Sequence, residues 1–306
     1  MAAPPGSSAP SRRPVIVGYD GREQGRDALA LGAGLATALG ARLVVASVYP
    51  SEGVMSPIPT DELHAEAQST ADAGLDELPR SLDSETWVVA ASSPARGLHE
   101  LAEETGAAVV VVGSSHRGAL GRVLAGTAAA QLLSGSPCPV AVAPRGLADR
   151  APVGLGRIGV GFDDGAESWN ALRCAASLAA AVGGAVRVIH AVPPLVMVPM
   201  APMAPVVLPT ELEPARRRAS ELATARAVAS LSEEVTPDAR SAVGDPVSVL
   251  EAEARGDIDL LVLGSRGFGP VRAVLLGSVS SELMRQARCP VMVVPRSASG
   301  EAFSPR

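Results

Sequence analysis

The sequence of 306 residues predicts an α/β fold of two similar, doubly wound domains, each built on a five-stranded parallel sheet. Two observations support this prediction. Short apolar runs such as residues 108–112 and 260–263 alternate with longer helix-like stretches, which is the pattern of buried parallel strands joined by helices. The whole pattern also occurs twice, at a spacing near 150 residues. A repeat of that length is the size of a domain and too long for a solenoid unit.

The repeat can be followed from the first strand to the last. Residues 15–20 correspond to 158–163, an offset of 143, and residues 138–142 correspond to 289–293, an offset of 151. The difference, 151 − 143, gives 8 additional residues in the second copy, most of them in its Pro- and Met-rich middle. Two copies of nearly equal length are expected to be related by a pseudo-two-fold axis. We therefore divide the chain into a disordered tail at 1–13, a first domain at 14–145, a linker at 146–156, a second domain at 157–296 and a tail at 297–306.

The elements of the first copy alternate regularly. Glycine at position 40 ends the first helix, and Ser92, Ser93 and Pro94 begin the third. Strands are expected at 15–17, 43–48, 86–90, 108–112 and 140–143, and helices at about 25–39, 60–78, 95–104 and 127–134. The second copy repeats this order, with helices at 169–182 and 216–231, a strand at 186–191 and a last strand at 291–294.

Composition excludes several classes of function. The net charge of −6 does not support a nucleic-acid surface, and no apolar stretch is long enough for a membrane span or a signal peptide, so a cytoplasmic protein is expected. All 26 basic residues are arginine, which excludes a Walker-A or Schiff-base lysine. The three cysteines do not have metal-site spacing, and Cys138 and Cys289 are expected to be buried, inert thiols.

Glycines follow the fourth strand in both copies. In the second copy the strand ends at Gly264, and Gly277 stands 13 residues later at the start of a helix. In the first copy Gly113 and Gly126 have the same spacing. Glycine lets a ligand approach the backbone, and the free N–H groups of a helix start suit phosphate. A single loop of this kind is usually a turn, but its recurrence favours an anion site.

These motifs resemble the universal stress protein family in its tandem form, over both halves of the chain. The family signature is glycine, two residues, glycine, nine residues, glycine and Ser or Thr. It is complete in the second copy. In the first copy it is degraded, because His116 replaces the second glycine, Gly267, and Ala129 stands in place of Ser280.

The resemblance implies that the protein binds ATP, with or without Mg²⁺. It implies contacts from the Asp after the first strand, from a backbone group at the end of the second strand, and from the glycine loop. The carboxylate would accept from ribose or adenine, and the helix start would hold the phosphates. Carried over position by position, the binding residues are Asp163, Ala191, Gly264, Gly267, Gly277, Ser278, Val279 and Ser280 in the second copy and Asp20, Val48, Gly113, Gly126 and Thr127 in the first. The second site is expected to be the stronger.

The leading hypothesis is an ATP-binding regulatory protein of stress physiology without a dedicated catalytic centre. No nucleophile–base pair or paired carboxylates stand out in the sequence. One alternative is a slow ATP hydrolase or adenylyl-transfer relative, although the Ser-Gly-Gly-x-Asp-Ser loop of those enzymes does not follow either first strand. The other alternative is a nucleotide-free interaction module whose loops are only structural.

The last strands, 140–143 and 291–294, are apolar and are expected to lie at sheet edges. We expect them to pair antiparallel and join the two domains into one intramolecular pair, as the resemblance also implies. Residues 193–209 are rich in Pro and Met and can be read either as an extended surface loop or as a flap that binds a partner, such as a second copy in a homodimer.

Overall fold

The computed structural model describes residues 13–51, 58–114, 127–150, 153–194, 212–265, 277–286 and 288–296. In the first half the elements are β1 (Val15–Gly18), α1 (Glu23–Leu39), β2 (Leu43–Pro50), α2 (Thr60–Asp76), β3 (Ser84–Ala91), α3 (Pro94–Thr105), β4 (Val109–Gly113), α4 (Thr127–Leu133) and β5 (Val140–Ala143). In the second half they are β6 (Arg157–Gly161), α5 (Ala166–Val182), β7 (Ala185–Val192), α6 (Leu212–Ala229), β8 (Thr236–Val243), α7 (Pro246–Ala254), β9 (Leu260–Gly264), α8 (Ser278–Gln286) and β10 (Val291–Val294).

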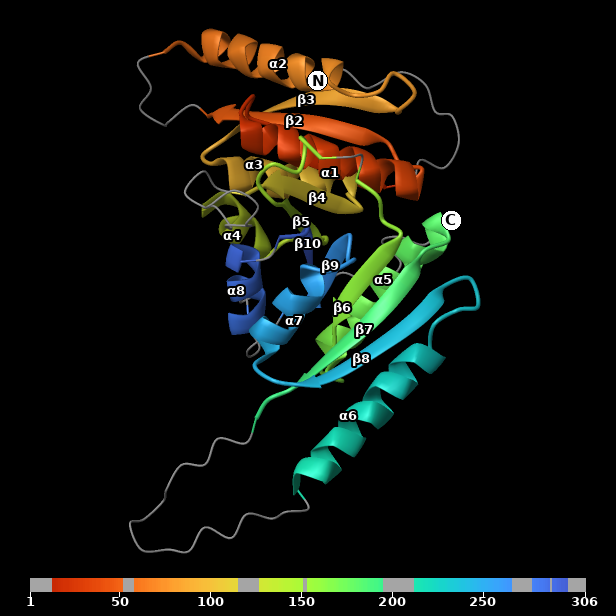
Figure 1. The fold of residues 1–306 in the computed structure, drawn as a ribbon. Helices are drawn as coiled ribbons and strands as arrows, with labels where there is room; N and C mark the ends of the chain where they lie inside the picture. Colours follow the sequence, from red (N-terminus) through yellow and green to blue (C-terminus); the bar gives the residue numbers. More distant parts are fainter. Residues whose placement is uncertain are drawn as a thin grey trace, which may run out of the picture.

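Within the described ranges, ten strands form one sheet in the order β3-β2-β1-β4-β5-β10-β9-β6-β7-β8 (Figure 1). All neighbours within each half run parallel. The two halves meet where β5 lies antiparallel to β10, with Val140 opposite Val293 and Val142 opposite Val291. The two edges that the sequence analysis expected to pair are therefore hydrogen-bonded to each other in this structure.

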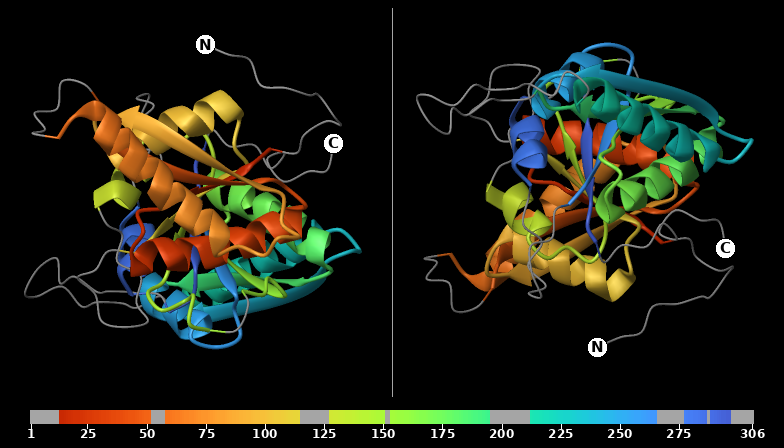
Figure 2. Two further views of the ribbon diagram at one scale, coloured as in Figure 1. Left: turned by 90° about the horizontal axis from the view of Figure 1, so that it is seen from above. Right: turned by 90° about the horizontal axis from the view of Figure 1, so that it is seen from below.

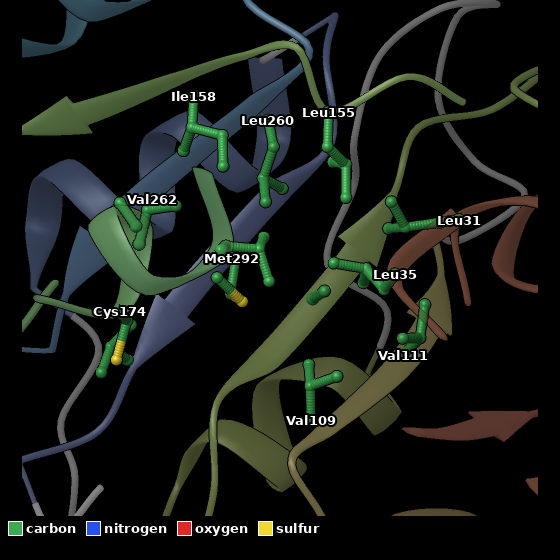
Figure 3. Packing of buried hydrophobic residues seen from close by; sticks show 14 of the residues in the cluster. Leu31, Leu35, Val109, Val111, Leu155, Ile158, Cys174, Leu260, Val262 and Met292 are labelled. Carbon is green, nitrogen blue, oxygen red and sulfur yellow. The ribbon is translucent and has the colours of Figure 1, made fainter. Parts of the chain in front are cut away.

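Helices cover both faces of the sheet, and each face has its own apolar core. One core contains side chains from α1, α2, α5 and α6, and the other contains side chains from α3, α4, α7 and α8. Figure 2 shows the same fold from above and from below, relative to the view in Figure 1. Both cores continue across the junction of β5 and β10. In Figure 3, Val109 and Val111 of the first half lie on the same core as Val262 and Met292 of the second.

The linker packs against the domains. The buried Asp27 of α1 accepts hydrogen bonds from the N–H groups of Gly146 (3.0 Å) and Ala148 (2.9 Å). Leu147 and Leu155 are both buried in the core that α1 and α5 share. These contacts fix the chain as it passes from one half to the other.

Two elements differ most from the sequence prediction. Helix α6 begins at Leu212, four residues earlier than expected, because Pro214 falls in its first turn, where the missing N–H has no helical partner to lose. Strand β8 was not assigned from the sequence, because most of its residues are exposed and include charged side chains. The start of α3 is confirmed: the Ser93 hydroxyl accepts a hydrogen bond from the Arg96 N–H (3.3 Å).

All three cysteines are buried and free of disulfides, and burial raises the pKa of Cys138, Cys174 and Cys289 to about 12 in each case. The expectation that Cys138 and Cys289 are buried is confirmed, and a raised thiol pKa is typical of an unreactive cysteine. The Pro- and Met-rich stretch expected at 193–209 lies almost wholly outside the described residues. No helix in the described part of the chain is long and apolar enough to cross a membrane.

Candidate functional site

Each half of the sheet contains a point where the order of the strands reverses. In the second half, β6 lies between β7 and β9, and in the first half β1 lies between β2 and β4. Ligands of open α/β sheets bind beyond the carboxyl ends of the strands at such points. Because β5 and β10 are antiparallel, the carboxyl ends of the strands in one half point in the opposite direction to those in the other half. The structure therefore has two candidate sites, one beyond the carboxyl ends of the strands of each half.

The turn after β6 presents Asp163 at the second site. The Asp163 side chain is exposed, and its Oδ1 accepts a hydrogen bond from the Gly165 N–H (3.0 Å). Its own N–H donates to the hydroxyl of Ser168 (3.3 Å). No residue in the described ranges donates a hydrogen bond to Asp163 Oδ2. One carboxylate oxygen thus shapes the turn, and the other is open to a ligand.

The corresponding turn after β1 differs in this respect. Asp20 Oδ1 accepts from the Arg22 N–H (3.2 Å), which matches the turn of the second copy. Asp20 Oδ2, however, accepts a hydrogen bond from Gln24 Nε2 (2.6 Å). The first carboxylate therefore has both oxygens engaged within the protein, and a ligand would have to displace Gln24.

The backbone of β7 continues beyond the end of β6. The Phe162 N–H donates to the Ile189 carbonyl (2.9 Å), so the backbone groups of Ile189 face β6. Those of Ala191, two residues further on, face the same side, where β6 has already ended. The first copy has the same arrangement at Val48, since the Tyr19 N–H donates to the Ala46 carbonyl (2.9 Å).

The two parts of the glycine signature lie together in the second half. The Ser280 hydroxyl, in the first turn of α8, donates a hydrogen bond to the Gly264 carbonyl at the end of β9 (3.4 Å). Gly277 is buried and its carbonyl accepts from the Ser281 N–H (2.9 Å), whereas Ser278 is exposed and Val279 packs on the core. The first N–H groups of α8 have no partner within the helix. This helix start is therefore held beside the end of β9.

The first half has the same elements in a simpler form. Gly113 ends β4 and Thr127 begins α4, but Ala129 stands where α8 has Ser280 and has no hydroxyl to make the equivalent bond. Gly126 and Gly267 lie outside the described residues, as does His116.

The glycines that end β4 and β9 also have a packing role, which the sequence did not reveal. A Cβ atom at Gly264 would lie 2.5 Å from the Glu167 carbonyl oxygen in the first turn of α5. A Cβ atom at Gly113 would meet the Gln24 carbonyl of α1 still more closely. These two glycines are thus required by the approach of a helix, whether or not a ligand is bound.

Two buried serine hydroxyls lie directly after the same strands. The hydroxyls of Ser114 and Ser265, which follow the two glycines directly, are buried and make no hydrogen bond within the described parts of the chain. The repeated Gly-Ser pair is visible in the sequence, so these serines could have been found from it. Such buried donors fit a site that receives a polar ligand.

His190, near the end of β7, lies near this site and packs against an aromatic ring. Its ring meets Phe162 edge-on, with centroids 6.4 Å apart. Burial lowers the pKa of His190, and the nearby Asp163 and Asp164 oppose that shift. Its Nδ1 is a further buried atom for which the described residues provide no hydrogen-bond partner.

The sequence profile of the universal stress protein family matches residues 11–144 and 154–295, so it matches each half of the chain once. The chain belongs to the universal stress protein family. It is 32% identical over 298 residues to a universal stress protein of Mycobacterium tuberculosis, covering 92% of this chain and 99% of that one. A second universal stress protein of the same organism is 31% identical over 208 residues, which is 67% of each chain. The tandem form inferred from the sequence is confirmed.

Solved structures show the same tandem fold. A universal stress protein from Archaeoglobus fulgidus superposes with a TM-score of 0.64 at 20% identity, over 92% of this chain and 98% of that chain. A protein of unknown function from Pseudomonas aeruginosa superposes with a TM-score of 0.64 at 17% identity, over 95% and 94% of the two chains. These matches support the two-domain α/β fold of the universal stress protein family.

Proposed function

We propose that this protein is a stress-response protein that binds ATP, and that the site at the end of β6 and β9 is the stronger of its two sites. The observation that carries this proposal is the open Oδ2 of Asp163, which lies at the strand reversal point where Ser280 holds the start of α8 beside Gly264. One acceptor and the N–H groups of a helix start, at the same end of the parallel strands, suit the two ends of a nucleotide.

Some residues of the second site are assigned to the nucleoside of ATP and others to its phosphates. Asp163 Oδ2 accepts from a ribose hydroxyl or an adenine amino group, and the backbone of Ala191 contacts the adenine edge. The first N–H groups of α8 and the exposed hydroxyl of Ser278 bind phosphate oxygens. Because the chain has no lysine, these groups carry the phosphate contacts without a cationic partner of the Walker-A kind.

A magnesium ion, if bound, would supply charge neutralisation between the phosphates. The described residues contain no cluster of three or more His, Cys, Asp or Glu side chains that could hold a metal. Mg²⁺ would therefore reach the site with the nucleotide, as it usually does when phosphates provide most of its ligands.

A nucleotide-free interaction module is the second candidate, and the packing of Gly264 and Gly113 against helix starts favours it. In that function the two glycines serve only to let the helices pack closely against the strand ends, and they take no part in binding a ligand. Mass spectrometry of the purified protein after denaturation separates the two candidates. We expect ATP to be released from the full chain; a preparation that releases no nucleotide and binds none when ATP is added would favour the interaction module.

We expect ATP hydrolysis to be slow or absent. The groups that this proposal assigns to phosphate, the first N–H groups of α8 and the Ser278 hydroxyl, are hydrogen-bond donors, and the carboxylate of Asp163 is assigned to the ribose or adenine end, away from an attacking water. Phosphate release measured with ATP and Mg²⁺ should stay far below the turnover of about 10 per second that is typical of enzymes. A metal-dependent rate near that value would instead support the hydrolase or adenylyl-transfer alternative.

A further inference from the structure

The turn that carries Asp163 contains an unusual backbone conformation. Asp164 has a φ of +63° and is the only non-glycine residue with a positive φ in the described parts of the chain. The equivalent residue of the first copy, 143 positions earlier, is Gly21, with a φ of +73°. Both turns therefore need a left-handed residue, but only the first uses the residue type that adopts this conformation freely.

The Asp164 side chain has two partners from different elements. Its Oδ1 accepts a hydrogen bond from the indole N–H of Trp169 in α5 (3.0 Å), and its Oδ2 accepts from Arg226 Nη2 in α6 (2.6 Å). Trp169 is held in turn by an edge-on contact with Phe162, at a centroid separation of 5.1 Å. The carboxylate of Asp164 thus connects the β6–α5 turn to α6.

We propose that Asp164 is a positioning residue that, together with Arg226, holds the second nucleotide site in its binding geometry and so makes ATP affinity depend on the placement of α6. This inference rests on the proposed function. Asp163 and Asp164 are adjacent, so a change of φ at Asp164 rotates the peptide that orients Asp163 and its hydrogen bond to Gly165. Asp164 binds no ligand itself; its two hydrogen bonds stabilise the left-handed turn.

The first copy has no such connection. Gly21 has no side chain, and the helix that corresponds to α6 is linked differently: Glu77, directly after α2, pairs with Arg26 (3.1 Å) and accepts a hydrogen bond from the Tyr19 hydroxyl (3.1 Å). The proposed effect of the turn residue on ATP affinity therefore applies only to the second site.

The test measures ATP affinity by calorimetry in four full-length variants. Asp164→Ala removes both hydrogen bonds and places alanine in a left-handed conformation, so we expect affinity to fall about tenfold. Arg226→Ala removes one partially exposed ion pair, and we expect a fall of about two- to fivefold. Asp164→Asn keeps an acceptor for Trp169 and tolerates the conformation, so it should retain more affinity than Asp164→Ala. Arg217→Ala is the matched control, because Arg217 lies on the same helix and, within the described residues, pairs only with Glu221 (3.9 Å).

A second readout follows the turn directly. With Trp87→Phe as the background, Trp169 is the only tryptophan, and its emission should shift in Asp164→Ala without any nucleotide present. If the wild type binds ATP, two results would overturn the inference and leave the proposed function intact. One is unchanged ATP affinity in Arg226→Ala, and the other is unchanged tryptophan emission in Asp164→Ala. A wild-type protein that binds no ATP would overturn the proposed function and the inference with it.

Discussion

Gly277→Val is expected to remove most of the ATP affinity, by about 100-fold or roughly 2.7 kcal/mol. Gly277 is buried directly before α8, whose first N–H groups have no partner within the helix and are proposed to bind phosphate. A branched side chain at this point occupies the approach to those donors, and no lysine elsewhere in the chain can replace them. Calorimetric titration of the full chain with ATP measures the loss.

Gly126→Val is the control for this experiment. Gly126 holds the equivalent position in the first copy, where the signature is degraded, so its substitution should change affinity only slightly. Thermal unfolding of both variants establishes that each is folded. Unchanged ATP binding in a folded Gly277→Val protein would contradict the assignment of the phosphates to the start of α8.

Val293→Asp is expected to destabilise the protein by about 3 kcal/mol or more, because it buries a carboxylate without a partner. Val293 is fully buried on β10, opposite Val140 of β5, where the two halves of the sheet join. Whole domains are stable by only about 5–15 kcal/mol, so this substitution should lower the denaturation midpoint strongly or prevent folding.

Val243→Asp provides a matched control on the outer strand β8. Val243 is 47% exposed, so the same substitution there leaves the new carboxylate in water and should change stability by about 0.5 kcal/mol or less. Urea denaturation compares the two variants. If Val293→Asp unfolds at the same urea concentration as Val243→Asp, the junction of β5 and β10 does not hold the halves together in solution.

The strands that pair on both sides were the easiest to predict, because burial on both faces leaves a continuous apolar run. β4, β5, β9 and β10 are of this kind. β8 was missed for the opposite reason: Pro237, Asp238 and Arg240 lie on an outer strand, where polar residues cost little.

The candidate site could be predicted only in part. The order of the strands, with Asp163 and Gly264 after neighbouring ones, follows from the repeat and the signature. The contact between Gly264 and Glu167 depends on how closely α5 approaches β9, which no local pattern encodes. The left-handed turn at Asp164 was missed because its partner Arg226 lies 62 residues away, on a different helix.

ATP titrations of Asp163→Ala and Asp20→Ala test the central proposal most directly, because the two carboxylates occupy equivalent turns and differ in their free oxygens. Losing a hydrogen bond to a charged group should weaken ATP binding about ten- to hundredfold in Asp163→Ala. Asp20→Ala should bind ATP within about twofold of the wild type, since Gln24 already engages its carboxylate. Wild-type affinity in Asp163→Ala, or a larger loss in Asp20→Ala, would contradict the placement of the nucleotide in the second half.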